Sequence, residues 1–298
     1  MKKRVTNSKP KKRDFEKKDA QSTKVRSPHS TKSKVPQYDF SQLPTELQPN
    51  SSNEGTRLNK YIANAGVCSR READKLIAEG EITINGKVVT ELGTKVFDKD
   101  IVAHGKQKLS AERLVYVLLN KPKDHITTMD DPFERKTVMN LVKNACEERI
   151  FPVGRLDRNT TGLLLLTNDG NVSERLSHPS NNIRKIYEVV LDKPLEEEHF
   201  ESITEGFDLE DGFIKVDSVA VSPYDPHIVG VEIHSGKNRI VRRIFEHFKY
   251  EVIKLDRTVY AGFSKKNLTR GKWRFLTEKE VLRLKQVGNT PKNKLRKK

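Results

Sequence analysis

The sequence predicts an α+β protein with two ordered parts. These are a small module of two helices and a sheet at residues 56–106, and a mixed, mostly antiparallel sheet domain at residues 113–287. Two observations predict this class. After residue 113 strand signals outnumber helix signals, and few strands are separated by the helix that a parallel βαβ order requires. Before residue 106, two short helical patterns precede a run of alternating strands.

Charge is concentrated at the two ends of the 298-residue chain. Residues 1–36 hold thirteen basic and three acidic side chains, a net +10, and residues 285–298 hold six basic and no acidic ones, a net +6. These two values sum to the whole net charge of +16, so the middle is neutral. We interpret residues 1–55 and 288–298 as basic tails, the first disordered because it has too few apolar residues to offset its ordering entropy. Such tails either attract a polyanion such as RNA or only aid solubility.

Cysteine content and hydropathy predict a cytoplasmic protein without a membrane segment. Cys68 and Cys146 are too few for a disulfide framework and fit a reducing compartment. The opening MKKRVTNSKPKKR has no apolar stretch behind it, and neither tail has the apolar face that would lie on a membrane. The longest apolar run, Leu114–Leu119, has six residues, far short of the roughly 20 that span a bilayer.

Two short helices open the small module. Thr56 can cap the first and Gly66 can end it. Ser69 and Glu72 form a capping box for the second, which Gly80 can end. The apolar positions follow helical spacing: Leu58, Tyr61, Ile62 and Ala65 in the first, and Ala73, Leu76 and Ile77 in the second. The stretch EITINGKVV then predicts two strands joined by an Asn85-Gly86 turn.

The polar faces of these helices are basic, which on most helices means only a solvated surface. Here the order of elements and the stretch RLNKYIANAGVCSRREADKLIAEGEITINGKVV resemble the S-four RNA-binding domain. The resemblance implies that the basic side chains contact phosphates of structured RNA. The candidates are Arg57, Lys60, Arg70, Arg71 and Lys75.

The larger part alternates between strand and helix patterns. Strands are predicted at residues 114–120, 151–154, 163–167, 185–192, 213–222, 228–234 and 273–276, with extended segments up to residue 260. Helices are predicted at residues 137–144, 171–177, 195–205, 240–248 and 278–285.

A polar loop before a buried strand is the strongest candidate site. The chain has no phosphate-cradling glycine motif, no HExxH and no CxxC, which makes nucleotide-dependent or metal-dependent chemistry improbable. The segment GRLDRNTTGLLLLTNDG instead places Asp157 between Arg155 and Arg158. Nearby cations favour an ionised carboxylate, which can act as nucleophile or base. A lone loop aspartate is nevertheless more often a turn or cap residue.

The same segment resembles the signature of RNA pseudouridine synthases in the family that contains RsuA, RluB, RluE and RluF, which couples an S-four domain to a catalytic domain. The resemblance implies that Asp157 is the catalytic carboxylate and that Tyr187, in RKIYEV, stacks on the target base. Uridine and pseudouridine are isomers, so no cofactor is expected. Attack on the ribose anomeric carbon, a glycal intermediate and attack on carbon 6 all stay open as routes.

A third motif, SGKNRIVRRIFE, enters a helix with four cations in seven residues. The resemblance implies that Arg242 is the partner of Asp157. Arg155, Lys237, Asn238 and Arg239 are then expected to bind the substrate RNA. An apolar residue that packs under the tyrosine is expected at Leu255.

These motifs predict a monomeric pseudouridine synthase that acts on 23S ribosomal RNA or a pre-ribosomal particle, most like the RluB branch. The alternatives are a non-catalytic RNA-binding assembly factor, the same chemistry on 16S ribosomal RNA or tRNA, and an N-glycoside hydrolase. A hydrolase would need a second carboxylate to activate water. Asp169, in TNDG, is interpreted as a strand-to-helix turn.

Overall fold

The computed structural model describes residues 34–44, 47 and 55–288. Residues 1–33, 45–46, 48–54 and 289–298 lie outside the described part, and with them most of the two basic tails predicted from the sequence. The small module and the sheet domain are described separately below.

Two helices and short strands form the small module. The strand β1 (Thr56–Arg57) leads into α1 (Leu58–Asn64) and α2 (Arg70–Ala78). A four-stranded sheet of order β3-β2-β5-β6 follows, while β4 pairs with β1. Its strands are β2 (Ile82–Ile84), β3 (Lys87–Val88), β4 (Lys95–Val96), β5 (Val102–His104) and β6 (Gln107–Lys108). The apolar stripes of both helices bury against β2, β4 and β5 in a core of their own.

Most local predictions for this module are confirmed, with one correction. Ser69 and Glu72 form the capping box of α2, and Asn85 and Gly86 take the positive φ angles, 53° and 78°, of a hairpin turn. Thr56 does not cap α1. Thr56 lies in β1 instead, where it pairs with Val96 of β4. The helix therefore begins after Arg57, whose side chain makes no capping hydrogen bond.

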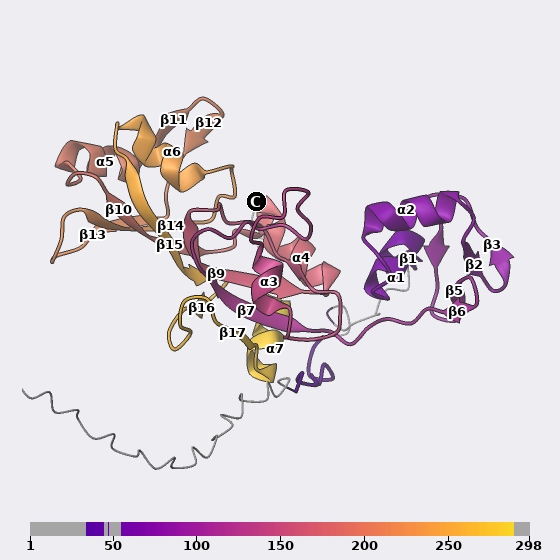
Figure 1. The fold of residues 1–298 in the computed structure, drawn as a ribbon. Helices are drawn as coiled ribbons and strands as arrows, with labels where there is room; N and C mark the ends of the chain where they lie inside the picture. Colours follow the sequence, from indigo (N-terminus) through magenta and orange to yellow (C-terminus); the bar gives the residue numbers. More distant parts are fainter. Residues whose placement is uncertain (1–33, 45–46, 48–54, 289–298) are drawn as a thin grey trace, which may run out of the picture. The chain divides into compact units, whose positions relative to one another are not determined.

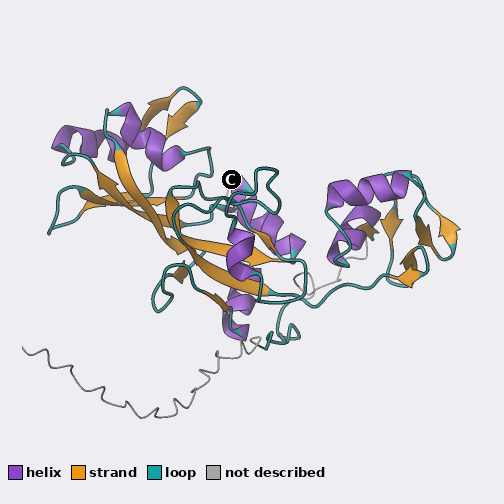
Figure 2. Cartoon of the chain, viewed as in Figure 1, coloured by secondary structure: helices purple, strands orange, loops and turns teal. Residues whose placement is uncertain are grey.

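A nine-stranded sheet organises the larger domain (Figures 1 and 2). Its order is β13-β14-β10-β15-β9-β7-β17, with β16 beside β15 and β8 beside β9. The pairing of β15 with β9 is parallel and the others are antiparallel, as the fold-class prediction requires. The strands are β7 (Tyr116–Lys121), β8 (Phe151–Pro152), β9 (Thr160–Thr167), β10 (Lys185–Leu191), β13 (Ser218–Val221), β14 (Ile228–Ile233), β15 (Val252–Tyr260), β16 (Phe263–Ser264) and β17 (Trp273–Phe275).

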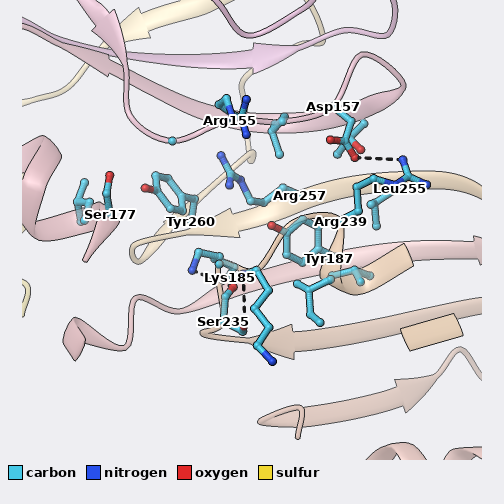
Figure 3. A pocket seen from close by; sticks show the side chains of 18 residues that line it. Arg155, Asp157, Ser177, Lys185, Tyr187, Ser235, Arg239, Leu255, Arg257 and Tyr260 are labelled. Carbon is cyan, nitrogen blue, oxygen red and sulfur yellow. Dashed lines mark hydrogen bonds and ion pairs between the residues drawn. The ribbon is translucent and has the colours of Figure 1, made fainter. Parts of the chain in front are cut away.

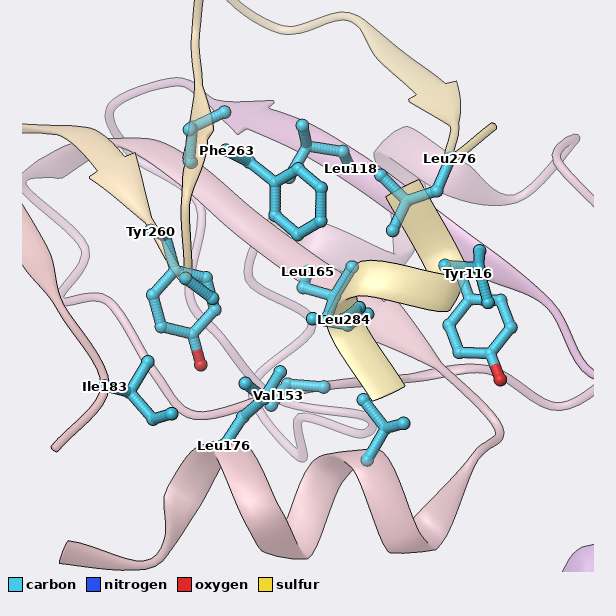
Figure 4. Close-up of a cluster of buried hydrophobic side chains, with 14 of the residues drawn as sticks. Tyr116, Leu118, Val153, Leu165, Leu176, Ile183, Tyr260, Phe263, Leu276 and Leu284 are labelled. Atoms are coloured by element: carbon cyan, nitrogen blue, oxygen red, sulfur yellow. The ribbon is translucent and has the colours of Figure 1, made fainter. Parts of the chain in front are cut away.

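Helices cover both faces of this sheet. They are α3 (Val138–Val142), α4 (Gly170–Ser177), α5 (Glu197–Glu205), α6 (Ile240–His247) and α7 (Glu278–Gln286), with a 3-10 turn, η2 (Pro179–Asn181), after α4. Alternate residues of β7 and β9 pack in opposite directions. Tyr116, Leu118, Leu163 and Leu165 bury under α4 and α7 (Figure 4), whereas Val117, Leu119, Leu164 and Leu166 bury under α3. A strand buried on both faces reads as a continuous apolar run, which is the pattern of residues 163–166.

The other end of the sheet has a separate core, in which α6 packs on β10, β14 and β15. Here the single strand predicted at residues 213–222 is wrong. Residues Gly212–Ile214 form β12, which turns back on β11 (Phe207–Leu209) in a two-stranded ribbon. The chain then changes direction before Ser218 joins β14 as β13.

The predicted disordered tail at residues 1–55 also needs correction, because residues 34–44 pack on the sheet domain. The Tyr38 hydroxyl donates to the carbonyl of Leu276 at 3.1 Å, and its ring meets Tyr116 edge-on at 5.3 Å. Leu43 is buried, and Phe40 lies 4.6 Å from the Lys285 ammonium. The aromatic residues in QYDF supply the apolar surface that the rest of the tail lacks.

Candidate active site

The loop that carries Asp157 joins β8 to β9 and is held from beneath by a buried lysine. Lys121, at the end of β7, donates from Nζ to the carbonyls of Asp157 at 2.9 Å, Arg158 at 3.2 Å and Thr160 at 2.8 Å. Burial lowers the pKa of Lys121 to about 8, against the opposing charge of Asp157. One ammonium group therefore fixes the backbone from Asp157 to Thr160, on the C-terminal side of the candidate catalytic side chain.

A threonine holds the other end of this loop. The Thr127 hydroxyl donates to the carbonyl of Leu156 at 2.8 Å and accepts from its N–H at 3.2 Å. Neither Thr127 nor Lys121 stands out in the sequence, because each follows an ordinary strand or loop pattern and only the fold brings it to residues 156–160.

Glycine allows the loop to continue into the parallel strand pair. Gly162 has φ +105°, and a Cβ there would lie 2.3 Å from the carbonyl oxygen of Arg257. The pairing of β9 with β15 sets Leu255 opposite Thr160. This close contact places the face of β15 that carries Leu255 and Arg257 next to the loop of Asp157.

These elements surround a cavity of about 200 Å³. Figure 3 shows the side chains that line it, which come from the loop after β8, the end of α4, β10, β15, and the segment that leads into the start of α6. Of the residues predicted from the sequence, the structure brings together Arg155, Asp157, Tyr187, Lys237, Arg239 and Leu255. Asn238 and Arg242 are not among the lining residues.

The cation that contacts Asp157 is Arg239. Its Nη1 lies 3.7 Å from Asp157 Oδ2, and the two side chains are 44% and 41% exposed. Arg239 stands at the N-cap of α6 with φ 46°, and it also reaches Glu246 at 3.1 Å. The pair is open to solvent.

The predicted pairing of Arg242 with Asp157 is therefore corrected. Arg242 lies inside α6, where its guanidinium turns towards the sheet and donates to the carbonyl of Val252 at 2.8 Å. Its Nε is buried without a hydrogen-bond partner. Burial and the nearby Arg239 lower the pKa of Arg242, while the charge of Asp157 acts in the opposite direction.

The other basic residues of this motif face an acidic turn. Arg243 donates two hydrogen bonds to Asp211, at 2.7 and 2.9 Å, and lowers the pKa of that aspartate to about 2. The Nζ of Lys237 lies 3.5 Å from the same carboxylate. Arg243 thus pairs with Asp211 and not with Asp157.

Tyr187 lies on β10 between Val231 of β14 and Arg257 of β15, and its ring borders the cavity. Leu255, two positions before Arg257 on the same face of β15, lines the cavity beside it. An aromatic and an apolar side chain therefore line the same cavity as Asp157.

Three charged or aromatic residues that line the cavity were not predicted as site residues from the sequence. Lys185 precedes Tyr187 by two positions on β10, and Arg257 and Tyr260 follow Leu255 on β15. Arg257 is only 3% exposed, and its guanidinium lies 4.2 Å from the Tyr260 ring centre. Period-2 alternation from Tyr187 and Leu255 could have located Lys185 and Arg257 on the cavity face.

The basic residues predicted for the small module lie on its helices and first strand. Arg57, Arg70, Arg71 and Lys75 are exposed, and Lys60 is half-buried. Their charges are thus at the surface, where phosphates could reach the exposed ones.

Comparisons with known proteins define the class of this chain. The RNA pseudouridylate synthase family profile matches residues 115–247, and the S4 domain profile matches residues 56–102. A crystal structure of a pseudouridylate synthase has a TM-score of 0.54 and 29% identity, covering 76% of this chain and 99% of its own. The fold is thus that of an RNA pseudouridine synthase, an isomerase.

Curated relatives assign the chain to a family. It is 42% identical to ribosomal large subunit pseudouridine synthase B of Bacillus subtilis strain 168, over 80% of this chain and 98% of that protein. It is 37% identical to the dual-specificity RNA pseudouridine synthase RluF of Escherichia coli K12, over 80% of each chain. The chain belongs to the family of RNA pseudouridine synthases that carry an N-terminal S4 domain. Within residues 34–44, 47 and 55–288, no helix is long and apolar enough to cross a membrane.

Proposed function

We propose that this enzyme converts a uridine of 23S ribosomal RNA to pseudouridine, with Asp157 as its catalytic carboxylate. The supporting observation is the placement of Asp157 beside Arg239 at one wall of a cavity that also presents Tyr187. The large-subunit RNA target is supported by the name of the Bacillus subtilis relative.

The roles of the side chains follow from their positions. A flipped uracil needs a flat surface to replace its lost stacking, and Tyr187 supplies one in the cavity. Asp157 then meets the ribose, where it attacks the anomeric carbon or takes part in forming a glycal. Arg239 directs the carboxylate, and Lys121 fixes the backbone that carries it. The base is detached, turned and rejoined through carbon 5, so no outside group enters the product.

Hydrolysis of the N-glycosidic bond is the weaker alternative. It needs a second carboxylate to activate water, and Asp157 is the one carboxylate among the described residues that line the cavity. Asp169 caps α4 and pairs with Lys285 at 2.8 Å. It does not line the cavity, so it is not placed to activate water there.

Replacement of the carboxylate tests the assignment. Asp157→Asn is nearly isosteric, so the purified variant should fold and bind an RNA fragment while forming no pseudouridine. The measurement is chromatography of nucleosides from digested RNA. Conversion at a rate near that of the wild type would contradict the role of Asp157. Mapping pseudouridine in the 23S RNA of a strain that lacks the protein tests the target.

A further inference from the structure

The wall of the cavity opposite the Asp157–Arg239 pair holds two cations that have no carboxylate partner. Arg257 donates from Nε to the carbonyl of Leu163 at 2.8 Å, and its Nη2 is buried without a hydrogen-bond partner. Figure 3 shows its guanidinium directed into the cavity between Tyr260 and Asp157. Lys185, on the neighbouring strand, donates to the carbonyls of His234 at 2.7 Å and Ser235 at 3.3 Å.

The charges near these two groups do not neutralise them. Asp256 follows Leu255 on β15 but points to the other face, where it contacts Thr161, Lys265 and Arg270. Asp217 contacts His234 at 2.7 Å and acts on Lys185 only at longer range. Among the described residues, no carboxylate lies within ion-pair distance of Arg257 or Lys185.

Burying a guanidinium without a carboxylate partner lowers the stability of the folded state. The cost is offset if negative charge arrives during the reaction. Burial and, to a smaller extent, repulsion from Arg257 lower the pKa of Lys185 to about 8. Phosphates of the RNA backbone stay near solvent, whereas Arg257 is 97% buried, so the base itself is the group that reaches this depth.

We propose that Arg257 and Lys185 form an anion-stabilising subsite for the uracil ring, holding its carbonyl edge and the negative charge that it carries once it is detached from the ribose. The proposal rests on the proposed function, and it adds two residues to that site. Tyr187, which is opposite Arg257 on the neighbouring strand and two positions after Lys185, then supplies the stacking surface.

The electron count of the reaction puts a negative charge on the detached base. When the C1′–N1 bond breaks, its electron pair stays on uracil, whether Asp157 forms an ester at C1′ or a proton leaves C2′ to give a glycal. The released base is an anion with its charge spread over N1, O2 and O4. Neutrality returns when C5 bonds to C1′, the ester opens or the C2′ proton returns, and the proton of C5 ends on N1. Preorganised donors act most strongly on charge that develops in a site shielded from water.

Single-turnover kinetics on two substrates test the subsite. The enzyme is mixed in excess with an RNA fragment that carries uridine or 5-fluorouridine at the target, and loss of that nucleoside is followed in digests. Fluorine makes the departing ring a better anion by itself, so less help from the protein is needed. Arg257→Gln and Lys185→Gln should each slow loss of uridine by about 100-fold, with a distinctly smaller penalty on 5-fluorouridine and little change in Kd.

A matched control and a rescue variant complete the design. Arg184 directly precedes β10 and pairs with Glu232 at 2.6 Å, outside the cavity. Arg184→Gln also removes one positive charge, but the rate of this variant should stay near that of the wild type. Arg257→Lys should recover part of the rate. If Arg257→Gln does not fold, Lys185→Gln carries the same comparison.

Different outcomes would contradict the subsite and the proposed function. Equal penalties on both substrates, or an effect seen only as a weaker Kd, would overturn the subsite and indicate a structural or phosphate-binding role. Wild-type enzyme that leaves uridine unchanged in the 23S fragment, while binding it, would instead contradict the proposed function itself.

Discussion

Three arginines at the start of α6 have different partners although they lie within five residues. Arg239 contacts Asp157 and Glu246, Arg242 donates to the carbonyl of Val252, and Arg243 pairs with Asp211. Sequence resemblance assigned the Asp157 contact to the second of these. Arg239 itself takes a left-handed backbone conformation at the N-cap of α6, and this directs its side chain towards Asp157. The spacing of the motif does not reveal that conformation.

We therefore expect Arg239→Ala and Arg242→Ala to show their defects in different assays. Arg239→Ala should lower the single-turnover rate by about 100-fold, because a donor that orients the reacting carboxylate is lost. It should barely alter the melting temperature, since a half-exposed ion pair contributes about 1 kcal/mol or less. Arg242→Ala should instead lower stability by about 1–3 kcal/mol, because the Val252 carbonyl loses its buried donor.

Arg243→Ala serves as the matched control for this pair. Its partner Asp211 lies outside the cavity, so the rate should change little. The test is the rate and the thermal melting curve of all three variants under one set of conditions. A severe rate loss in Arg242→Ala with an unchanged rate in Arg239→Ala would restore the pairing that was predicted from the sequence.

Lys121 gives the stability of the protein a calculable pH dependence. Its pKa is about 8 in the folded chain and about 10.4 when unfolded. Between these values the unfolded chain binds more protons, so the contribution of Lys121 to the free energy of unfolding rises with pH. The difference in unfolding free energy between wild type and Lys121→Met should therefore increase from pH 8 to pH 10.

Denaturant titrations at pH 8, 9 and 10 measure that difference. Lys121→Met should also slow catalysis at every pH, since the carbonyls of Asp157, Arg158 and Thr160 lose their common donor. A difference that stays flat or falls with pH would mean that Lys121 keeps an ordinary pKa in the folded state.

At the scale of elements, α7 is anchored by a charged group within the apolar core. Lys285 Nζ lies 2.8 Å from Asp169 Oδ2, and Tyr116 donates to the same oxygen at 2.6 Å. Asp169 in turn accepts from the N–H groups of Asn171 and Val172 at the start of α4. One carboxylate thus joins β7, α4 and α7. Lys285 was counted with the C-terminal basic tail in the sequence, but it is buried and belongs to the core.

Lys285→Met should therefore destabilise the domain by about 3–5 kcal/mol, because it leaves a buried carboxylate without its cation. Burial alone would raise the pKa of Asp169, but Lys285 and the hydrogen bonds hold it below its ordinary value. This stability is present above pH about 4 and is lost as the pH falls through the lowered pKa. The acid limb of the unfolding curve should accordingly be shallower in Lys285→Met.

Denaturant unfolding from pH 2 to pH 7 tests both statements. The double variant Lys285→Met with Asp169→Asn should recover part of the loss at neutral pH, since no buried charge is then unpaired. A single variant that is as stable as the wild type would show that α7 is held by apolar packing alone.

The elements themselves were largely predictable, and the contacts between them were not. Capping residues and apolar periodicity located α2, α4, α6 and α7 to within a few residues, because these signals act within one segment. The parallel contact between β9 and β15 depends on pairing across about 95 residues, and no local pattern encodes it. For that reason the motifs pointed to Asp157, Tyr187 and Leu255. Alternation from Leu255 could have added Arg257, whereas Lys121 emerged only from the fold.

At the scale of the whole molecule, the N-terminal segment has two parts with different physical character. Residues 1–33 hold twelve basic and three acidic side chains, while residues 34–44 pack Tyr38, Phe40 and Leu43 against the sheet domain. Burial raises the pKa of Tyr38 to about 12, in keeping with its place beneath β17 and α7. Residues 1–55 were predicted to be a single tail because charged residues dominate the average composition of the segment.

Two truncations should therefore separate RNA attraction from folding. Removing residues 1–33 takes away a net charge of +9 and should flatten the dependence of RNA affinity on salt, because fewer counterions are released. The melting temperature should stay unchanged. Removing residues 1–44 should give the same salt dependence but a lower melting temperature, since Leu43 and the Tyr38–Leu276 hydrogen bond are also lost. Burying one large apolar side chain contributes about 1.5–3 kcal/mol.

Tyr38→Ala in the full-length chain should reproduce the stability loss and leave the salt dependence intact. Equal melting temperatures for the two truncations would mean that residues 34–44 do not stabilise the domain, and equal salt slopes for the full chain and the first truncation would leave the basic residues without a part in RNA binding.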